Sequence, residues 1–162
     1  MKKIVLNNKQ KSVLLDKMVS SARKGNLATS ALALDKNKIV AASESWVVSQ
    51  TDATAHAERM LIGRICQDRG NNHTPGLTLV TVVEPCLMCL SAAAWAGYER
   101  IAYIIPAKRY QEKIPWMSDC PGLDKDKIAR GLRNSVTLEH LGLHEKEFAR
   151  VFEKLMGRQL VP

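Results

Sequence analysis

The segment Leu77–Val83 limits the possible folds of this chain more than any other stretch of its sequence. Its residues are nearly all apolar or β-branched, which is typical of a strand that is covered on both faces. Glu84-Pro85 ends this strand, and the alanine-rich residues 86–96 predict a helix directly after it. A fully covered strand followed by a helix indicates a sheet with helices on both faces.

The other segments continue this alternation of helical and extended patterns. Helices are predicted over residues 13–22, 52 or 54 to 68, 125–132 and 144–156, and extended segments over 29–34, 38–43, 101–105 and 135–139. Asp52 or Thr54 is expected to cap the second helix. The order predicts an α/β fold, namely a three-layer α/β/α sandwich with a mixed five-stranded sheet and helices on both faces.

Length and composition fit one globular domain. The chain has 162 residues, of which 46% are apolar and 25% are charged, so we expect a single domain over residues 1–162. No apolar run approaches the roughly 18 residues that span a bilayer. The apolar stretch after Met1-Lys2-Lys3 is also too short for a secretory signal. We therefore expect a cytoplasmic protein with no membrane partner. Four cysteines are too few for a disulfide scaffold at this length.

The net charge of +8 is concentrated at one end of the chain. Residues 1–24 hold seven basic side chains and one acidic one, whereas residues 25–98 hold five basic and six acidic ones. A basic end can attract nucleic acid. A solvated, lysine-rich helix face that only aids solubility has the same composition. The charge alone leaves both interpretations open.

Two short motifs carry the candidate chemistry. His56-Ala57-Glu58 lies at a predicted helix start, and Pro85-Cys86-Leu87-Met88-Cys89 lies where a strand meets a helix. A helix N-terminus favours thiolate over thiol, and residues three apart on a helix can face one point. Two thiolates and one imidazole make three ligands, as in catalytic zinc sites that keep a position open for water. Glu58 is placed to act beside the metal as a base.

Three other interpretations compete with a catalytic zinc. A thioredoxin-type redox motif also has Cys-x-x-Cys at a helix start, but it leaves His56-Ala57-Glu58 unexplained. A structural zinc needs a fourth protein ligand. The candidates for it, none with ligand spacing to a partner, are His73, His140, His144, Cys66 and Cys120. Finally, His56 could be a core histidine and the two motif cysteines apolar filler, although the joint occurrence of both motifs disfavours this combination.

Residues 52–58 (DATAHAE) and 84–90 (EPCLMCL) resemble the zinc-dependent cytidine/deoxycytidylate deaminase superfamily. Within it they are similar to the branch that contains bacterial guanine deaminases and tRNA adenosine deaminases. The resemblance implies a cytidine deaminase-like fold in which His56, Cys86 and Cys89 hold one Zn²⁺ per chain. It also implies that Glu58 carries a proton from the attacking water to a ring nitrogen, and that the protein is a homodimer.

The resemblance further implies candidate substrate-binding residues. The backbone of Ala57 is expected to line the pocket. Trp95 fits a Trp-Ala pair that guanine deaminases show, although a core-packing aromatic explains it equally well. Ser45 stands where relatives have an asparagine that hydrogen-bonds the substrate, and Ser30 stands where they have a glycine. A hydroxyl cannot reproduce the two-sided hydrogen bonding of an amide, so the pocket is expected to differ from theirs.

The proline-containing loop 106–124 offers a further candidate, Asp119. Its carboxylate is able to accept hydrogen bonds from ring N–H or amino groups, although a loop-surface carboxylate is an equally good interpretation. Trp116 and Met117 in the same loop suit a lid over a small ring.

The residues predict a zinc-dependent hydrolase, and the resemblance implies that it acts on the C–N bond of a cyclic amidine and releases ammonia. The favoured substrate is a small-molecule base or nucleoside, with a purine such as guanine as the leading choice, because the motif-bearing residues 25–98 are slightly acidic. One alternative is a tRNA adenosine-to-inosine deaminase. Another is a catalytically silent zinc- or RNA-binding module of the same fold, which would have no need of Glu58.

Overall fold

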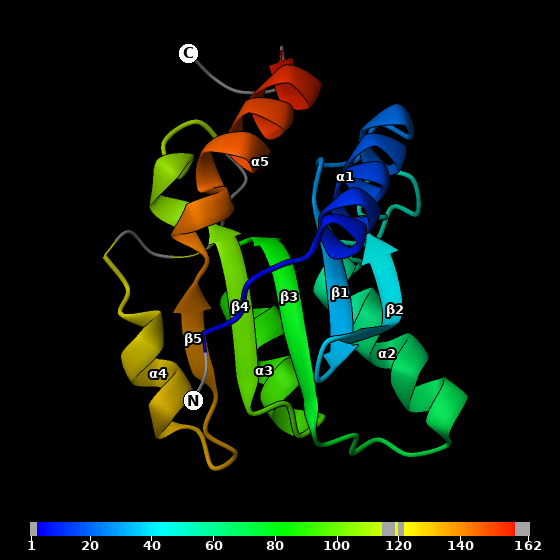
Figure 1. Cartoon of the computed structure of the whole chain (residues 1–162), viewed down its shortest axis with the longest axis vertical. Coiled ribbons are helices and arrows are strands. Elements are labelled where there is room, and N and C mark those ends of the chain that lie inside the picture. The colour runs from blue at the N-terminus through cyan, green and yellow to red at the C-terminus, as the bar shows by residue number, and fades with distance from the viewer. Residues whose placement is uncertain (1–2, 115–118, 120–121, 158–162) are drawn as a thin grey trace.

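The computed structural model describes residues 3–114, 119 and 122–157 (Figure 1). Its helices are α1 (Asn8–Arg23), α2 (Ala57–Arg69), α3 (Leu87–Trp95), α4 (Lys125–Gly131) and α5 (Gly142–Met156). Its strands are β1 (Ser30–Asp35), β2 (Lys38–Glu44), β3 (Leu77–Val83), β4 (Arg100–Ile105) and β5 (Thr137–His140). A short 3-10 helix, Ala107–Arg109, follows β4.

The strands form one mixed sheet in the order β2-β1-β3-β4-β5. β1 pairs antiparallel with both β2 and β3, whereas β3, β4 and β5 run parallel to one another. Parallel strands bring their carboxyl ends to the same edge of a sheet, and this edge is where open α/β sheets bind ligands. The residues that follow β3, β4 and β5 are therefore the first place to look for a site.

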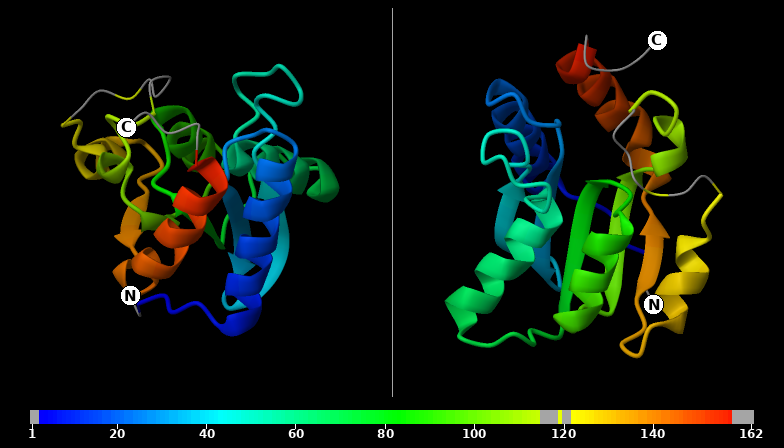
Figure 2. Two further views of the ribbon diagram at one scale, coloured as in Figure 1. Left: turned by 90° about the horizontal axis from the view of Figure 1, so that it is seen from above. Right: turned by 180° about the vertical axis from the view of Figure 1, so that it is seen from behind.

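Helices cover both faces of this sheet (Figure 2). α1 and α5 pack on one face, where Leu14 and Phe148 share a core with Leu32. α2 and α3 pack on the other face, where Leu61 and Leu90 belong to a second core, and α4 lies beside β5 and α3. The predicted three-layer sandwich with a mixed five-stranded sheet is confirmed. None of the helices in the described ranges is long and apolar enough to cross a membrane.

The N-terminus of α2 differs from its sequence prediction. The N-cap is His56, so neither Asp52 nor Thr54 caps this helix. Instead, the Asp52 carboxylate accepts hydrogen bonds from the backbone N–H and the hydroxyl of Thr54, at 2.8 and 2.7 Å, and closes a turn in the preceding loop. Asp52 and Thr54 are thus hydrogen-bonded to each other before the helix, which begins at Ala57.

The first and last helices are longer than their hydrophobic patterns predict. α1 begins at Asn8 because Asn7 and Gln10 form a capping box, in which each side chain accepts a hydrogen bond from the other residue's backbone N–H. α5 begins at Gly142. The predicted lid residues Trp116 and Met117 lie outside the described residues.

Candidate active site

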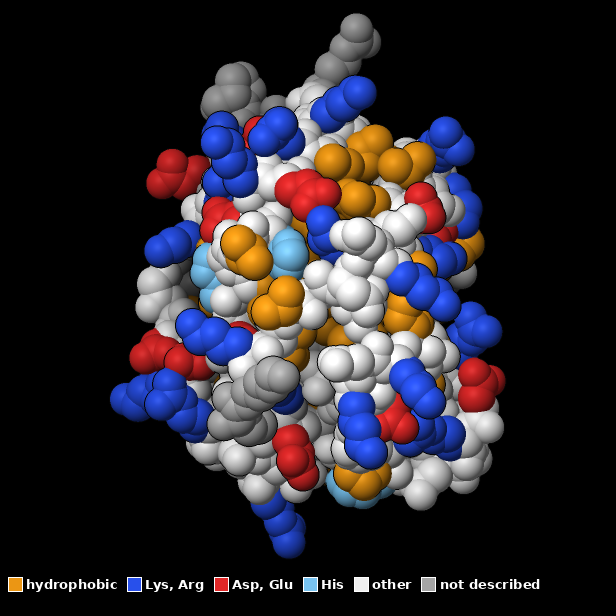
Figure 3. All heavy atoms as spheres, in the orientation of Figure 1, with side chains coloured by type: hydrophobic (Ala, Val, Ile, Leu, Met, Phe, Trp, Pro, Cys, Tyr) orange, Lys and Arg blue, Asp and Glu red, His pale blue; other side chains and the backbone are white. Residues whose placement is uncertain are grey.

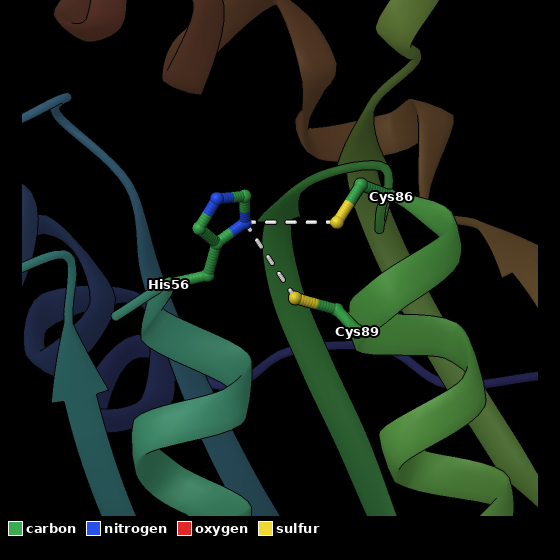
Figure 4. Close-up of side chains that lie close together, drawn as sticks. All are labelled: His56, Cys86 and Cys89. Atoms are coloured by element: carbon green, nitrogen blue, oxygen red, sulfur yellow. Dashed lines mark hydrogen bonds between the residues drawn. The ribbon is translucent and has the colours of Figure 1, made fainter. Parts of the chain in front are cut away.

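The N-termini of α2 and α3 meet at the carboxyl end of β3, and their first side chains face each other (Figure 4). His56 is the N-cap of α2, and Cys86 is the N-cap of α3. Neither side chain makes a capping hydrogen bond, although a good cap stabilises a helix by about 1 kcal/mol. Both helices thus lack the side-chain capping hydrogen bond, and each N-cap side chain instead faces the same point.

His56, Cys86 and Cys89 form a compact cluster. His56 Nδ1 lies 3.6 Å from Sγ of Cys86 and 3.6 Å from Sγ of Cys89. All three ligand atoms lie within 4.8 Å of one another. In a tetrahedral zinc site, bonds of about 2.0 Å to nitrogen and 2.3 Å to sulfur separate the two ligand atoms by about 3.6 Å. The cluster therefore fits one zinc ion per chain.

The two thiols of the cluster differ in acidity. The hydrogen bond from Cys89 lowers the pKa of Cys86 to about 4, against the opposing effect of burial. The same contact raises the pKa of Cys89, and burial adds to that rise. The hydrogen bond with Cys86 also raises the pKa of His56. Zinc binding requires all three side chains to lose their protons, so zinc affinity is expected to fall at acidic pH.

Glu58 lies in the first turn of α2, immediately beside the cluster. It is only 8% exposed, and burial raises the pKa of its carboxyl. Its carboxyl is within hydrogen-bonding reach of the Cys89 side chain, but it is not one of the three mutually close ligand atoms. A buried carboxyl with a raised pKa, next to a metal site but not in it, is suited to taking up and passing on a proton.

The alternative zinc ligands do not join this cluster. Among the described residues it contains no fourth ligand, so His140, His144 and Cys66 lie apart from it, as does His73, which packs against the backbone of Gly97. Cys120 lies outside the described residues. Cys86 and Cys89 are free thiols rather than a disulfide. The geometry thus favours a three-ligand site over a structural zinc or a redox pair.

Two of the predicted substrate-binding residues lie beside the cluster. Ala57, the first residue of α2, is fully buried next to His56. The Asp119 carboxylate accepts a hydrogen bond from the backbone N–H of Leu87, the residue after Cys86, at 3.4 Å. Its side chain is 10% exposed. Asp119 therefore belongs to the neighbourhood of the α3 N-terminus and is not a loop-surface carboxylate.

Ser45 and Ser30, the two serines expected to stand in place of an asparagine and a glycine, have different surroundings. Ser45 is buried directly after β2, and its neighbour Trp46 donates a backbone hydrogen bond to the Ala55 carbonyl at 2.9 Å, which closes the loop just before His56. The Ser30 hydroxyl donates to the Leu14 carbonyl of α1 at 2.8 Å. Ser30 therefore points to the sheet face opposite α2 and α3.

Trp95 is not brought to the cluster. It is the last residue of α3, and Cys86 caps the other end of that helix, about 13 Å away at 1.5 Å per residue. Its side chain is 82% exposed, so it is not a core-packing aromatic either. The structure thus supports neither the substrate-binding nor the core-packing prediction for Trp95, which is exposed at the end of α3.

One buried side chain near the site had no predicted role. Lys125 of α4 is 6% exposed and lines a cavity of about 530 Å³ to which Glu84, directly before the turn that carries Cys86, also contributes. The charged residues that line this cavity are Glu84, Lys108, Arg109, Asp119, Lys125 and Glu145. No local pattern could identify Lys125, because its partners Glu84 and Pro85 lie in a segment far away in the sequence.

Comparison with protein families identifies the class of this chain. Residues 7–105, more than half of its length, match the model of the cytidine and deoxycytidylate deaminase zinc-binding region. The chain therefore belongs to this deaminase family, as its fold and its His-Cys-Cys cluster also indicate.

Curated relatives differ in the activities that their names give, as two of them illustrate. The tRNA-specific adenosine deaminase of Agrobacterium fabrum is 36% identical over 72 residues, which cover 44% of this chain and 47% of that protein. The guanine deaminase of Bacillus subtilis is 37% identical over 65 residues, which cover 40% and 42%. The chain thus spans about half the length of the curated relatives that it matches.

Solved structures share the fold. A guanine deaminase from Nitrosomonas europaea superposes with a TM-score of 0.79 at 16% identity, covering 94% of this chain and 86% of that one. A tRNA:A34 deaminase superposes with a TM-score of 0.66 at 21% identity, covering 80% and 95%. At these identities the likeness extends to the architecture and not to the substrate.

Proposed function

We propose that this chain is a zinc-dependent hydrolase that deaminates a purine base or nucleoside, with guanine as the leading substrate. The observation that carries the proposal is the cluster of His56, Cys86 and Cys89 with the buried carboxyl of Glu58 beside it. Three protein ligands are typical of a catalytic zinc. The reaction replaces an exocyclic C–NH₂ with C=O, consumes one water and releases ammonia.

In this mechanism the protein supplies the metal ligands and moves the protons. His56, Cys86 and Cys89 would hold the zinc ion, which when bound lowers the pKa of a water to about 7. Glu58 accepts the proton that the attacking water gives up and delivers it to the ring nitrogen next to the reacting carbon. Glu58 then takes the proton of the newly formed hydroxyl and passes it to the amine, which departs as ammonia. The raised pKa of the buried carboxyl favours its uptake of each proton. Asp119 would accept hydrogen bonds from the ring N–H or amino groups.

A small substrate is favoured over tRNA because acidic partners offset part of the basic N-terminal segment. The buried carboxylate of Glu44 forms two ion pairs with this segment. Its Oε2 lies 3.1 Å from Nζ of Lys17, and its Oε1 pairs with Lys24. Lys11 pairs with Glu147 at 3.4 Å. On the face shown in Figure 3, basic side chains are scattered among acidic ones. An enzyme that binds tRNA needs a basic surface for several phosphates.

A tRNA adenosine deaminase is the second candidate, because the Agrobacterium fabrum relative is named for that reaction. A catalytically silent zinc- or RNA-binding module is the third. Glu58 argues against a catalytically silent module. Burying a carboxyl costs stability, and a purely structural zinc site does not need one.

We further propose that residues 1–162 form a single deaminase domain that assembles as a homodimer in the cytoplasm. The support for a dimer is Trp95, whose side chain is 82% exposed at the end of α3. Large aromatic side chains are enriched in subunit interfaces.

Ammonia release from a panel of bases, nucleosides, nucleotides and tRNA tests the substrate. We expect turnover of guanine or another small purine, with little change between low and moderate salt. Salt-sensitive conversion of adenosine to inosine in tRNA, without activity on any small molecule, would select the second candidate. No ammonia from any substrate with zinc-loaded protein would select the silent module.

A further inference from the structure

Lys125 is the centre of a buried polar contact set that joins α4 to the turn carrying Cys86. Its Nζ lies 2.8 Å from Oδ2 of Asp119 and 3.5 Å from Oε1 of Glu84, and it donates to the Pro85 carbonyl at 3.0 Å. A lysine ammonium has three N–H donors and no acceptor. The ammonium thus faces one carbonyl and two carboxylate oxygens, and it compensates two carboxylates that are only 10% and 17% exposed.

Both carboxylates use their second oxygen to bind backbone next to the site. Oδ1 of Asp119 accepts from the N–H of Leu87 at 3.4 Å, in the first turn of α3. Oε2 of Glu84 accepts from the N–H of Ala107 at 2.9 Å, directly after β4. Lys125 therefore connects the ends of β3 and β4, the start of α3 and the residue Asp119, which belongs to no helix or strand.

We propose that Lys125 is a positioning residue for the deamination reaction: its ammonium holds the Asp119 carboxylate beside the start of α3, where Asp119 binds the substrate. This inference rests on the proposed function. Asp119 lies outside the regular elements, and within the described part of the chain its carboxylate has two polar contacts, of which the one to Lys125 is the shorter. Without the cation, the carboxylates of Asp119 and Glu84 face each other unpaired, and their repulsion moves Asp119 away.

The test replaces Lys125 and measures substrate binding and turnover separately. Lys125→Met removes all three donors while keeping an unbranched apolar stem. Lys127→Met is the matched control, because Lys127 lies on the same helix with an exposed side chain. Asp119→Asn and the double variant Lys125→Met/Asp119→Asn complete a cycle. Each protein is assayed for zinc content, KM and kcat on the best substrate of the panel.

We expect Lys125→Met to keep about one zinc per chain and to raise KM about ten- to a hundred-fold, the usual range for a hydrogen bond to a charged group. The kcat should stay within about threefold of the wild-type value, since the ligands and Glu58 are untouched. In the double variant, loss of Lys125 should add almost nothing to the effect of Asp119→Asn, because the lysine acts through that carboxylate. Lys127→Met should resemble the wild type.

A purely structural role predicts different results. A wild-type KM with a lowered melting temperature, KM increases that multiply in the double variant, or loss of zinc would each overturn the assignment. If Lys125→Met does not fold, Lys125→Gln carries the same test, because its amide can donate to Pro85 but brings no charge to Asp119. Failure of the proposed function looks different, since the wild type and the Lys127→Met control would then release no ammonia from any substrate, and the assignment would fall with it.

Discussion

Replacing Glu58 with glutamine separates proton transfer from metal binding. The substitution keeps the size of the side chain and leaves His56, Cys86 and Cys89 in place, so the variant should retain about one zinc per chain. Glu58 is 8% exposed, and water therefore cannot easily take over its role. Loss of a positioned acid–base group lowers turnover by about 10²–10⁴-fold, which corresponds to about 3–5 kcal/mol of transition-state stabilisation.

The fold should not suffer from the same change. Burial raises the pKa of Glu58 because it disfavours the charged carboxylate, and a neutral amide avoids that cost. We therefore expect the melting temperature of Glu58→Gln at pH 7 to equal or exceed that of the wild type. Ammonia release, zinc content and melting temperature are measured on the same preparation. Asp68→Asn is the control, because this exposed carboxylate lies on the same helix and forms a surface ion pair with Arg64. Turnover of Glu58→Gln within tenfold of the wild type would refute the proton-transfer role.

Two further predictions concern stability and assembly. Burial opposes ionisation of Glu44, yet hydrogen bonds from Lys24 and Ser20 and the ion pair with Lys17 hold its pKa below the ordinary 4.5. Its stabilising effect is therefore present above that pH and is lost as the pH falls through the lowered value. Glu44→Gln should therefore lower the free energy of unfolding in urea by about 1–3 kcal/mol at pH 7 and by much less at pH near 3, and an equal loss at both pH values would contradict this. Trp95→Glu should shift the homodimer toward monomer in light scattering, whereas Leu143→Glu on α5, also an exposed apolar residue, should not. An unchanged dimer in Trp95→Glu would remove Trp95 from the interface.

The metal cluster could be predicted from the sequence because each ligand sits at a helix start with a local signature. His56 and Cys86 are N-caps, and Cys89 lies in the first turn after Cys86. The order of helical and extended patterns also predicted the layers, since the largely buried β3 requires cover on both faces. What local patterns missed was the cap of α2, because Asp52 forms its turn with Thr54 before the helix begins.

Contacts between segments that are distant in the sequence could not be predicted from local patterns. Lys125 meets Glu84 and Pro85 only because folding brings α4 to the turn that follows β3. Nothing in the spacing of these residues signals that their charges combine. Trp95 illustrates the same limit for a single side chain, since exposure at a helix end depends on the packing of the whole α3 face.

Zinc content measured together with ammonia release tests the central claim, a catalytic zinc held by His56, Cys86 and Cys89, most directly. We expect purified protein to contain about one zinc per chain, to lose ammonia release when a chelator removes the metal, and to regain it when zinc is restored. Cys89→Ala should lose both zinc and activity, whereas Cys66→Ala, a free cysteine outside the cluster, should keep both. Full zinc occupancy in Cys89→Ala, or undiminished ammonia release from the metal-free protein, would contradict the account.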